Sequence, residues 1–128
     1  MLNMAVVIGN LAKPVDVRSL PSGDSVASFD LQVLQADKPP DTVPVTLSET
    51  PERAADWPVG EQLLVIGRVR RRFFRVGSGT QSRTEVVAEK VLLLYGEEDA
   101  VAALAEAGTA LELIVEDLGR ASPGGSSD

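Results

Sequence analysis

The sequence predicts a small, mainly β protein that closes as a Greek-key barrel and adds one helix at its C-terminal end. Short runs rich in Val, Ile and Leu, separated by Gly- and Pro-containing turns, fill residues 1–95. The hydrophobic period then changes from that of a strand to that of a helix. A length of 128 residues allows one ordinary domain with a short appendage.

The first two predicted strands lie close together at the N-terminus. Residues 3–11 are dominated by Val, Ile and Met, and they end at a Gly-Asn turn signal. Residues 15–20 alternate less regularly between apolar and polar side chains. The motif Pro21-Ser22-Gly23-Asp24 follows, with Pro and Gly in positions typical of a turn.

The middle of the sequence predicts two more strands and a short helix. Residues 26–34 alternate strictly, as in a strand with one buried face. A polar loop is expected over residues 35–40. Residues 42–47 form a strand candidate that Pro44 restricts to a sheet edge or a strand end. A brief helix should begin at Thr50-Pro51-Glu52-Arg53, an N-cap followed by Pro at the first helical position.

Two long strands and a helix complete the prediction. Residues 61–76 and 81–94 are strand candidates joined by the turn Gly77-Ser78-Gly79-Thr80. Residues 97–118 are helical in period, and three acids lie near the start, where the helix dipole favours them. The sequence therefore divides into a barrel domain over residues 1–95, an acidic amphipathic helix over residues 96–119 and a flexible tail over residues 120–128.

Charge is distributed unevenly along the chain. The formal net charge is −7, yet residues 61–95 carry a net charge of +4 and residues 96–128 carry −7. This asymmetry suggests a barrel patch that faces a polyanion and an acidic appendage. The alternative is that both are ordinary solvated surfaces. The acidic helix could pack on its own barrel or pair with its copy in another subunit.

The composition excludes most familiar enzyme designs. The chain has no His and no Cys, so it lacks the commonest general base, the commonest metal ligands and any disulfide. We therefore expect no catalytic residue, no metal site and no cofactor. No apolar run exceeds six residues and no signal-peptide pattern precedes these runs, so we expect a cytoplasmic protein that does not enter a membrane.

One basic segment has the composition of a nucleic-acid contact. Residues 67–75 hold five arginines in nine positions. Strand alternation places Arg68, Arg70, Arg72 and Phe74 on one face, and Val69, Arg71, Phe73 and Arg75 on the other. Arginines can follow phosphates, and a stacked base contributes about 1–3 kcal/mol. The alternative is a solvent-exposed strand whose arginines pair with Asp30, Glu85 or Glu89.

Three groups of motifs follow one another in a fixed order over residues 1–95. They are Asn3-x-x-Val6-x-Ile8-Gly9-Asn10-Leu11 with Val17-Arg18, Pro21-x-Gly23 and Phe29-x-Leu31; Gly60-x-x-Leu63-x-Val65-x-Gly67-Arg68-Val69-x-x-Arg72-x-Phe74; and Thr84-Glu85-Val86-Val87-Ala88-Glu89-x-Val91. Together they resemble the bacterial single-stranded DNA-binding proteins. The resemblance implies a five-stranded oligonucleotide/oligosaccharide-binding (OB) barrel with a short helix between its third and fourth strands.

The resemblance also implies a function and partners. Members of that family assemble as homotetramers and wrap single strands over basic and aromatic residues, in replication, repair or recombination. A dimer or tetramer associated with the nucleoid is therefore expected, with a first-strand interface at Leu2, Met4, Val6 and Ile8. Residues expected to contact single-stranded DNA are Arg68, Arg70, Arg72, Phe74 and Arg75, with added phosphate contacts from Lys13, Arg18 and Arg83.

The sequence departs from that family in its aromatic residues and its end. Residues 35–41 and 42–48 lack the stacking aromatics usual there, so Phe74 is the expected stacking platform and Trp57 is expected to pack. The family's acidic Pro-Phe recruitment tip is also not found. These departures support an alternative function, in which the barrel serves oligomerisation or modifies a full-length paralogue and binds DNA weakly or not at all.

Overall fold

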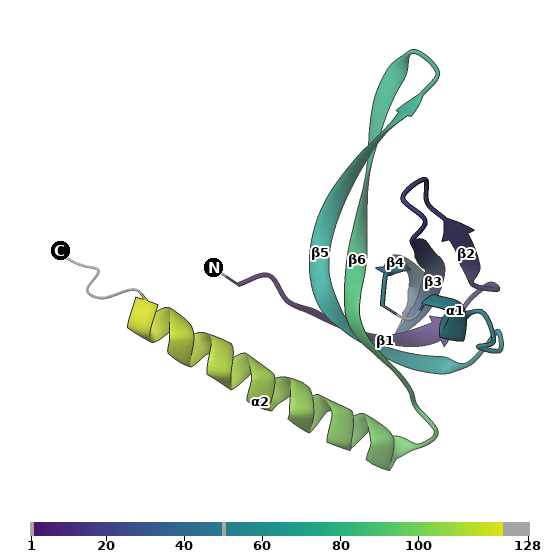
Figure 1. The fold of residues 1–128 in the computed structure, drawn as a ribbon. Helices are drawn as coiled ribbons and strands as arrows, with labels where there is room; N and C mark the ends of the chain where they lie inside the picture. The colour runs from purple at the N-terminus through teal and green to yellow at the C-terminus, as the bar shows by residue number, and fades with distance from the viewer. Residues whose placement is uncertain (1, 50, 122–128) are drawn as a thin grey trace.

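A computed structural model describes residues 2–49 and 51–121 as a strongly curved β-sheet closed into a barrel, with a long helix along one side (Figure 1). Its elements are β1 (Ala5–Leu11), β2 (Asp16–Ser19), β3 (Ser25–Gln35), β4 (Lys38–Leu47), α1 (Pro51–Ala54), β5 (Gln62–Val76), β6 (Gly79–Leu93) and α2 (Glu97–Ala121). The predicted N-cap Thr50 and the predicted tail beyond Ala121 lie outside the described residues. No helix within the described part of the chain is long and apolar enough to cross a membrane.

Strand β1 closes the barrel because it pairs with two different strands. The sheet order is β1-β5-β6-β4-β3-β2, and all pairs are antiparallel except β4 with β6. Strand β1 pairs with β5 from Ala5 to Asn10, and its last residues, Asn10 and Leu11, also pair with β3. Strands β1, β3, β4, β5 and β6 thus form a closed five-stranded barrel, and β2 extends the sheet beside β3. The fold class predicted from the sequence is confirmed.

Two glycines stand where the backbones approach too closely for a side chain. The ladder between β5 and β6 shifts register after Ile66, and a Cβ on Gly67 would lie 2.0 Å from the Val87 carbonyl oxygen. A Cβ on Gly9, where β1 turns toward β3, would lie 2.8 Å from the Gln32 carbonyl oxygen. Both positions therefore require glycine, as expected at bulges and sharp barrel bends.

Alternating side chains fill the barrel, as the sequence pattern predicts. Its core cluster draws on every strand of the barrel, with the largest fully buried members at Leu11, Leu31, Val45, Leu63 and Val65. Helix α1 adds Ala54 below it. Trp57 packs edge-on against Phe29, with ring centroids 5.5 Å apart and an interplanar angle of 86°. The expected packing role of Trp57 is confirmed.

The predicted polar loop at residues 35–40 is wrong. Strand β4 already begins at Lys38, and only a two-residue turn, Ala36-Asp37, separates it from β3. Three prolines, Pro39, Pro40 and Pro44, are tolerated in β4 because its residues before Val45 pair with β3 alone, and β6 joins from Val45 onward. A proline in a strand costs no ladder hydrogen bond on an unpaired edge. The restriction of Pro44 to such an edge is therefore as predicted.

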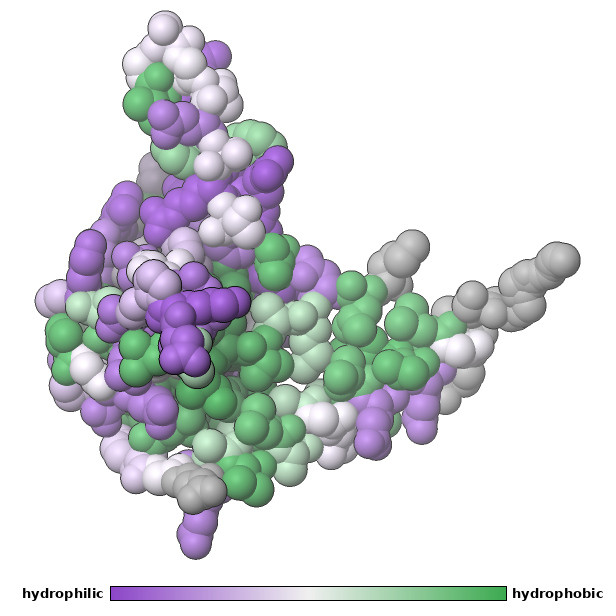
Figure 2. All heavy atoms as spheres, turned by 180° about the vertical axis from the view of Figure 1, so that it is seen from behind, coloured by the Kyte–Doolittle hydropathy of each residue, from purple (hydrophilic) through white to green (hydrophobic). Residues whose placement is uncertain are grey.

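Helix α2 packs on its own barrel, the first of the two arrangements left open by the sequence. Ala103 is buried in a second cluster with Leu64 and Leu94, and Ala100 and Ile8 pack against it. Lys90 of β6 and Glu106 of α2 form an ion pair across the same junction. Figure 2 shows hydrophobic side chains gathered along the helix and the adjoining side of the barrel. The helix runs to Ala121, slightly beyond the predicted helical segment.

Candidate nucleic-acid interface

Basic residues from β2 and β5 meet in one groove, here called the arginine groove. It has a volume of about 450 Å³ and is lined by Arg18, Leu20, Val26, Ser28, Thr46, Ser48, Arg70, Arg71 and Arg72. These residues come from β2, the turn after it, β3, the end of β4 and β5. Ser28 and Thr46 alternate with core residues, so the groove lies on the face of the sheet turned away from the core. Three arginines thus surround a surface with serine and threonine hydroxyls.

Strands β5 and β6 continue past the barrel as a two-stranded projection, here called the arm (Figure 1). Residues 71–84 are exposed throughout. The arm ends in a two-residue turn at Gly77-Ser78, and Gly77 has a φ of 60°, which favours glycine. The arm carries Arg75 and Arg83 beyond the groove lining, so the basic surface extends from the barrel to the arm.

Three of the predicted contact residues already form ion pairs. Arg70 donates from Nε to Oε2 of Glu85 over 3.2 Å, and the Glu85 side chain is only 4% exposed. Arg83 lies 3.4 Å from Asp30, and Arg18 lies 2.9 Å from Asp16. Within the described residues, the alternative in which arginines of residues 67–75 pair with Asp30, Glu85 or Glu89 therefore holds for Arg70 alone, and Arg83 of β6 pairs with Asp30. The pairs of Arg18 and Arg70 reduce the positive charge that the groove offers to phosphates, and the pair of Arg83 reduces that of the arm.

Other basic side chains near the groove and on the arm form no ion pair within the described residues. On β5, four arginines form no ion pair with any residue in the described part of the chain: Arg68, Arg71, Arg72 and Arg75. Lys13, in the link between β1 and β2, is also exposed and forms no such pair within residues 2–49 and 51–121. Of the predicted contacts, Arg18, Arg70 and Arg72 line the groove, whereas Lys13, Arg68, Phe74, Arg75 and Arg83 lie outside its lining.

Replacing Arg70 by alanine should lower stability as well as reduce positive charge. The substitution leaves the buried Glu85 carboxylate without its ion-pair partner, and an unsatisfied charged group costs more than a neutral one, which costs about 1–3 kcal/mol. Urea unfolding of the Arg70→Ala variant measures this loss. An unfolding midpoint equal to that of the wild type would contradict the structural role of the pair.

Two neighbouring phenylalanines on the arm are exposed. Phe74 is 38% exposed and Phe73 is 65% exposed. The ladder places Phe74 opposite Gln81 and Phe73 opposite Ser82, so the two rings lie on opposite faces of the arm. The sequence predicts Phe74 as the stacking platform and places Phe73 on the opposite face of the strand. The structure shows that Phe73 is the more accessible ring.

Arg71 lines the groove, although it was not among the contact residues predicted from the sequence. Strand alternation assigns this residue to the opposite face from Arg70 and Arg72, yet all three line the groove. A twisted strand at the mouth of a barrel allows long side chains to reach across the edge. The only sequence signal for Arg71 was its place within the run of arginines.

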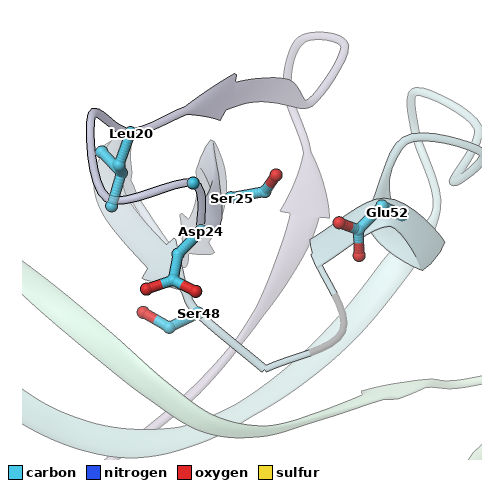
Figure 3. A pocket seen from close by; sticks show the side chains of 6 residues that line it. Leu20, Asp24, Ser25, Ser48 and Glu52 are labelled. Atoms are coloured by element: carbon cyan, nitrogen blue, oxygen red, sulfur yellow. The ribbon is translucent and has the colours of Figure 1, made fainter.

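A polar hollow of about 500 Å³ adjoins the arginine groove and shares Leu20 and Ser48 with it (Figure 3). Its lining also includes Gly23, Ser25 and the carboxylates of Asp24 and Glu52. Ser22 Oγ hydrogen-bonds the Asp24 carboxylate at 3.3 Å. Because carboxylates repel phosphates, this hollow marks an end of the basic surface.

The residues predicted for a subunit interface face the chain's own helix. Ile8 packs with Leu64 and Ala103 beneath α2. Leu2, Met4 and Val6 line an apolar groove of about 380 Å³ together with Leu104, Ala107, Gly108 and Leu111 of α2. Their predicted role between subunits stays a prediction.

Comparison with known proteins resolves the family. Residues 2–94 match the model of the single-strand binding protein family. The chain belongs to this family. The match covers the whole barrel and stops before α2, so the resemblance inferred from the sequence motifs is confirmed over the same region.

Individual relatives agree with this assignment. A single-stranded DNA-binding protein 2 from Listeria innocua is 34% identical over 103 aligned positions, which cover 73% of this chain and 65% of that protein. The chain thus spans slightly less than two thirds of this curated relative. A Plasmodium falciparum single-strand binding protein, solved in complex with single-stranded DNA, superposes with a TM-score of 0.63 at 20% identity. That superposition covers 73% of this chain and 96% of the other, and it supports the OB fold.

Proposed function

We propose that this chain binds single-stranded DNA without sequence preference, along the arginine groove and the arm. The observation that carries the proposal is the meeting of Arg18 from β2 with Arg71 and Arg72 from β5 around one surface. Membership of the single-strand binding protein family supports it. A role in replication, repair or recombination follows from such binding, and the proposal assigns no catalytic step to the chain.

The proposed contacts combine charge and stacking. Arg68, Arg71 and Arg72 neutralise phosphates, and Arg75 extends this contact toward the end of the arm. Phe74 stacks on a base, which is independent of sequence because every base offers a π face. Exposure also makes Phe73 a possible second platform on the other face of the arm. The hydroxyls of Ser28 and Ser48 add hydrogen-bond partners within the groove.

Binding should weaken steeply as salt rises. Each neutralised phosphate on a single strand contributes about −0.7 to the slope of log affinity against log salt concentration. If three to four of the arginines without an ion pair each neutralise one phosphate, we expect a slope of roughly −2 to −3. Fluorescence anisotropy of a labelled oligothymidine, titrated with protein at several salt concentrations, measures this slope.

The outcome of that titration separates the two functions inferred from the sequence. Salt-sensitive binding with the expected slope supports the proposal. If the protein does not bind oligothymidine even at low salt, the proposal fails, and the alternative of an OB barrel kept for assembly becomes the better explanation.

Homo-oligomerisation through β1 forms part of the same proposal. Between Ala5 and Gly9, β1 pairs with β5 on one edge, and within the described residues no strand covers its other edge. An uncovered edge can pair with the same edge of a second copy. Sedimentation equilibrium tests this, and a monomeric mass at all concentrations would contradict it. A nucleoid-associated location and a mixed assembly with a full-length paralogue remain predictions.

A further inference from the structure

The side chain of Asn3 makes a two-point contact with the backbone of β5. Its Nδ2 donates to the Val69 carbonyl oxygen at 2.7 Å, and the Val69 N–H donates to Asn3 Oδ1 at 2.9 Å. The register of β1 with β5 pairs Ala5 with Gly67, so Asn3 stands opposite Val69. A side-chain amide carries the same donor and acceptor as a peptide group. Asn3 precedes Ala5, the first residue of β1, so its side chain extends the ladder between β1 and β5 beyond the N-terminal end of β1.

Val69 is the place where β5 leaves the barrel. It lies between Arg68 and Arg70, two residues after the close backbone approach at Gly67. Beyond Val69, the described strands pair β5 only with β6. Asn3 is thus the last recorded hydrogen-bonding anchor on this edge of β5 before the arm begins.

Helix α2 lies beside the segment that carries Asn3. Leu2 and Met4, the residues on either side of Asn3, line the apolar groove together with Leu104 and Leu111 of α2. The short segment is therefore hydrogen-bonded to β5 and shares an apolar groove with the helix. This arrangement connects α2, which lies outside the region matched by the family, to the base of the arginine-bearing arm.

We propose that Asn3 is a positioning residue for single-strand binding: its amide fixes β5 at Val69, and α2 keeps that amide in place. The inference rests on the proposed function. Fixing the backbone between Arg68 and Arg70 restricts the directions in which their side chains leave the strand. A binding surface that is ordered in advance loses less entropy when the ligand binds.

The test compares Asn3→Ala with Asn10→Ala in the full chain. Asn10 lies on the same strand, and no side-chain hydrogen bond from it is recorded among the described residues, so it controls for the loss of an asparagine. In the absence of DNA, hydrogen exchange of the Val69 amide should become roughly tenfold faster in Asn3→Ala, as expected for one lost hydrogen bond. Exchange at Leu64, inside the barrel, should not change.

Affinity for oligothymidine is the second measurement. Asn3→Ala should bind about fivefold more weakly than wild type, the effect of a less ordered arm. The slope against salt should be unchanged, because the same phosphates are neutralised. An affinity equal to that of Asn10→Ala would overturn the positioning role, as would equal acceleration of exchange at Val69 and Leu64, which indicates global destabilisation.

A further variant tests the contribution of α2. Leu104→Ala/Leu111→Ala removes two apolar side chains that line the groove with Leu2 and Met4, and it leaves the net charge unchanged. It should also accelerate exchange at Val69, and an unchanged Val69 amide would overturn the role of the helix. Because exchange is measured without DNA, failure of the wild type to bind oligothymidine would reject the proposed function separately from the Asn3 anchor.

Discussion

Replacing Gly67 by alanine is expected to lower the free energy of unfolding by about 3 kcal/mol or more, at the upper end of the cost of overpacking. The new Cβ would lie 2.0 Å from the Val87 carbonyl oxygen and 2.8 Å from its carbonyl carbon. Both atoms belong to the backbone, so no side-chain rotation can relieve the overlap. The two long strands must separate where they leave the barrel.

Urea unfolding followed by circular dichroism measures this effect, and Gly108→Ala is the matched control. A Cβ on Gly108 meets nothing within 4 Å, and the residue lies inside α2. The control should therefore gain up to about 1 kcal/mol from helix propensity. Equal stability of Gly67→Ala and wild type would show that the close approach of β5 and β6 is not required.

The double substitution Arg72→Ala/Phe74→Ala is expected to weaken single-strand binding by about 100-fold, from the loss of one stacked base and one phosphate contact. Arg72 lines the arginine groove and forms no ion pair within the described residues. Phe74 follows on the same strand and exposes its ring. Neither side chain belongs to the core cluster, so the barrel should remain folded.

This variant avoids the ambiguity of Arg70, whose removal leaves Glu85 unpaired. Its control is Arg53→Ala on α1, which removes one positive charge outside the groove lining. Anisotropy titrations at low salt compare the two with wild type. Binding by the double variant as tight as that of the control would place the DNA on another surface.

Much of the fold could be predicted from local sequence patterns. Period-two alternation in residues 26–34 and the Gly-rich turn at residues 77–80 identify strands because neighbouring residues decide them. The start of β4 was missed because prolines usually interrupt strands, and only the sheet order reveals that this part of β4 has a free edge. The Gly67 bulge likewise depends on a partner strand that the sequence does not specify.

The candidate site was predicted less completely because it is assembled across the sheet. The arginine run indicated β5, but the approach of Arg18 from β2 depends on barrel closure. Glu85 was named as a possible partner, whereas its burial beneath Arg70 required the structure. The family resemblance led us to expect Leu2, Met4 and Val6 at a subunit interface, and the sequence could not show that α2 adjoins them.

The most direct test of the central claim is a map of backbone amide chemical shifts in the full chain during titration with oligothymidine at low salt. We predict that the largest changes fall on residues 68–76 and 79–85, which form the arm and its base, and on β2 and the start of β3, which border the arginine groove. Changes on α1 and on the first half of α2 should be small. Saturable changes confined to the helices, with none in the groove or arm, would contradict the claim.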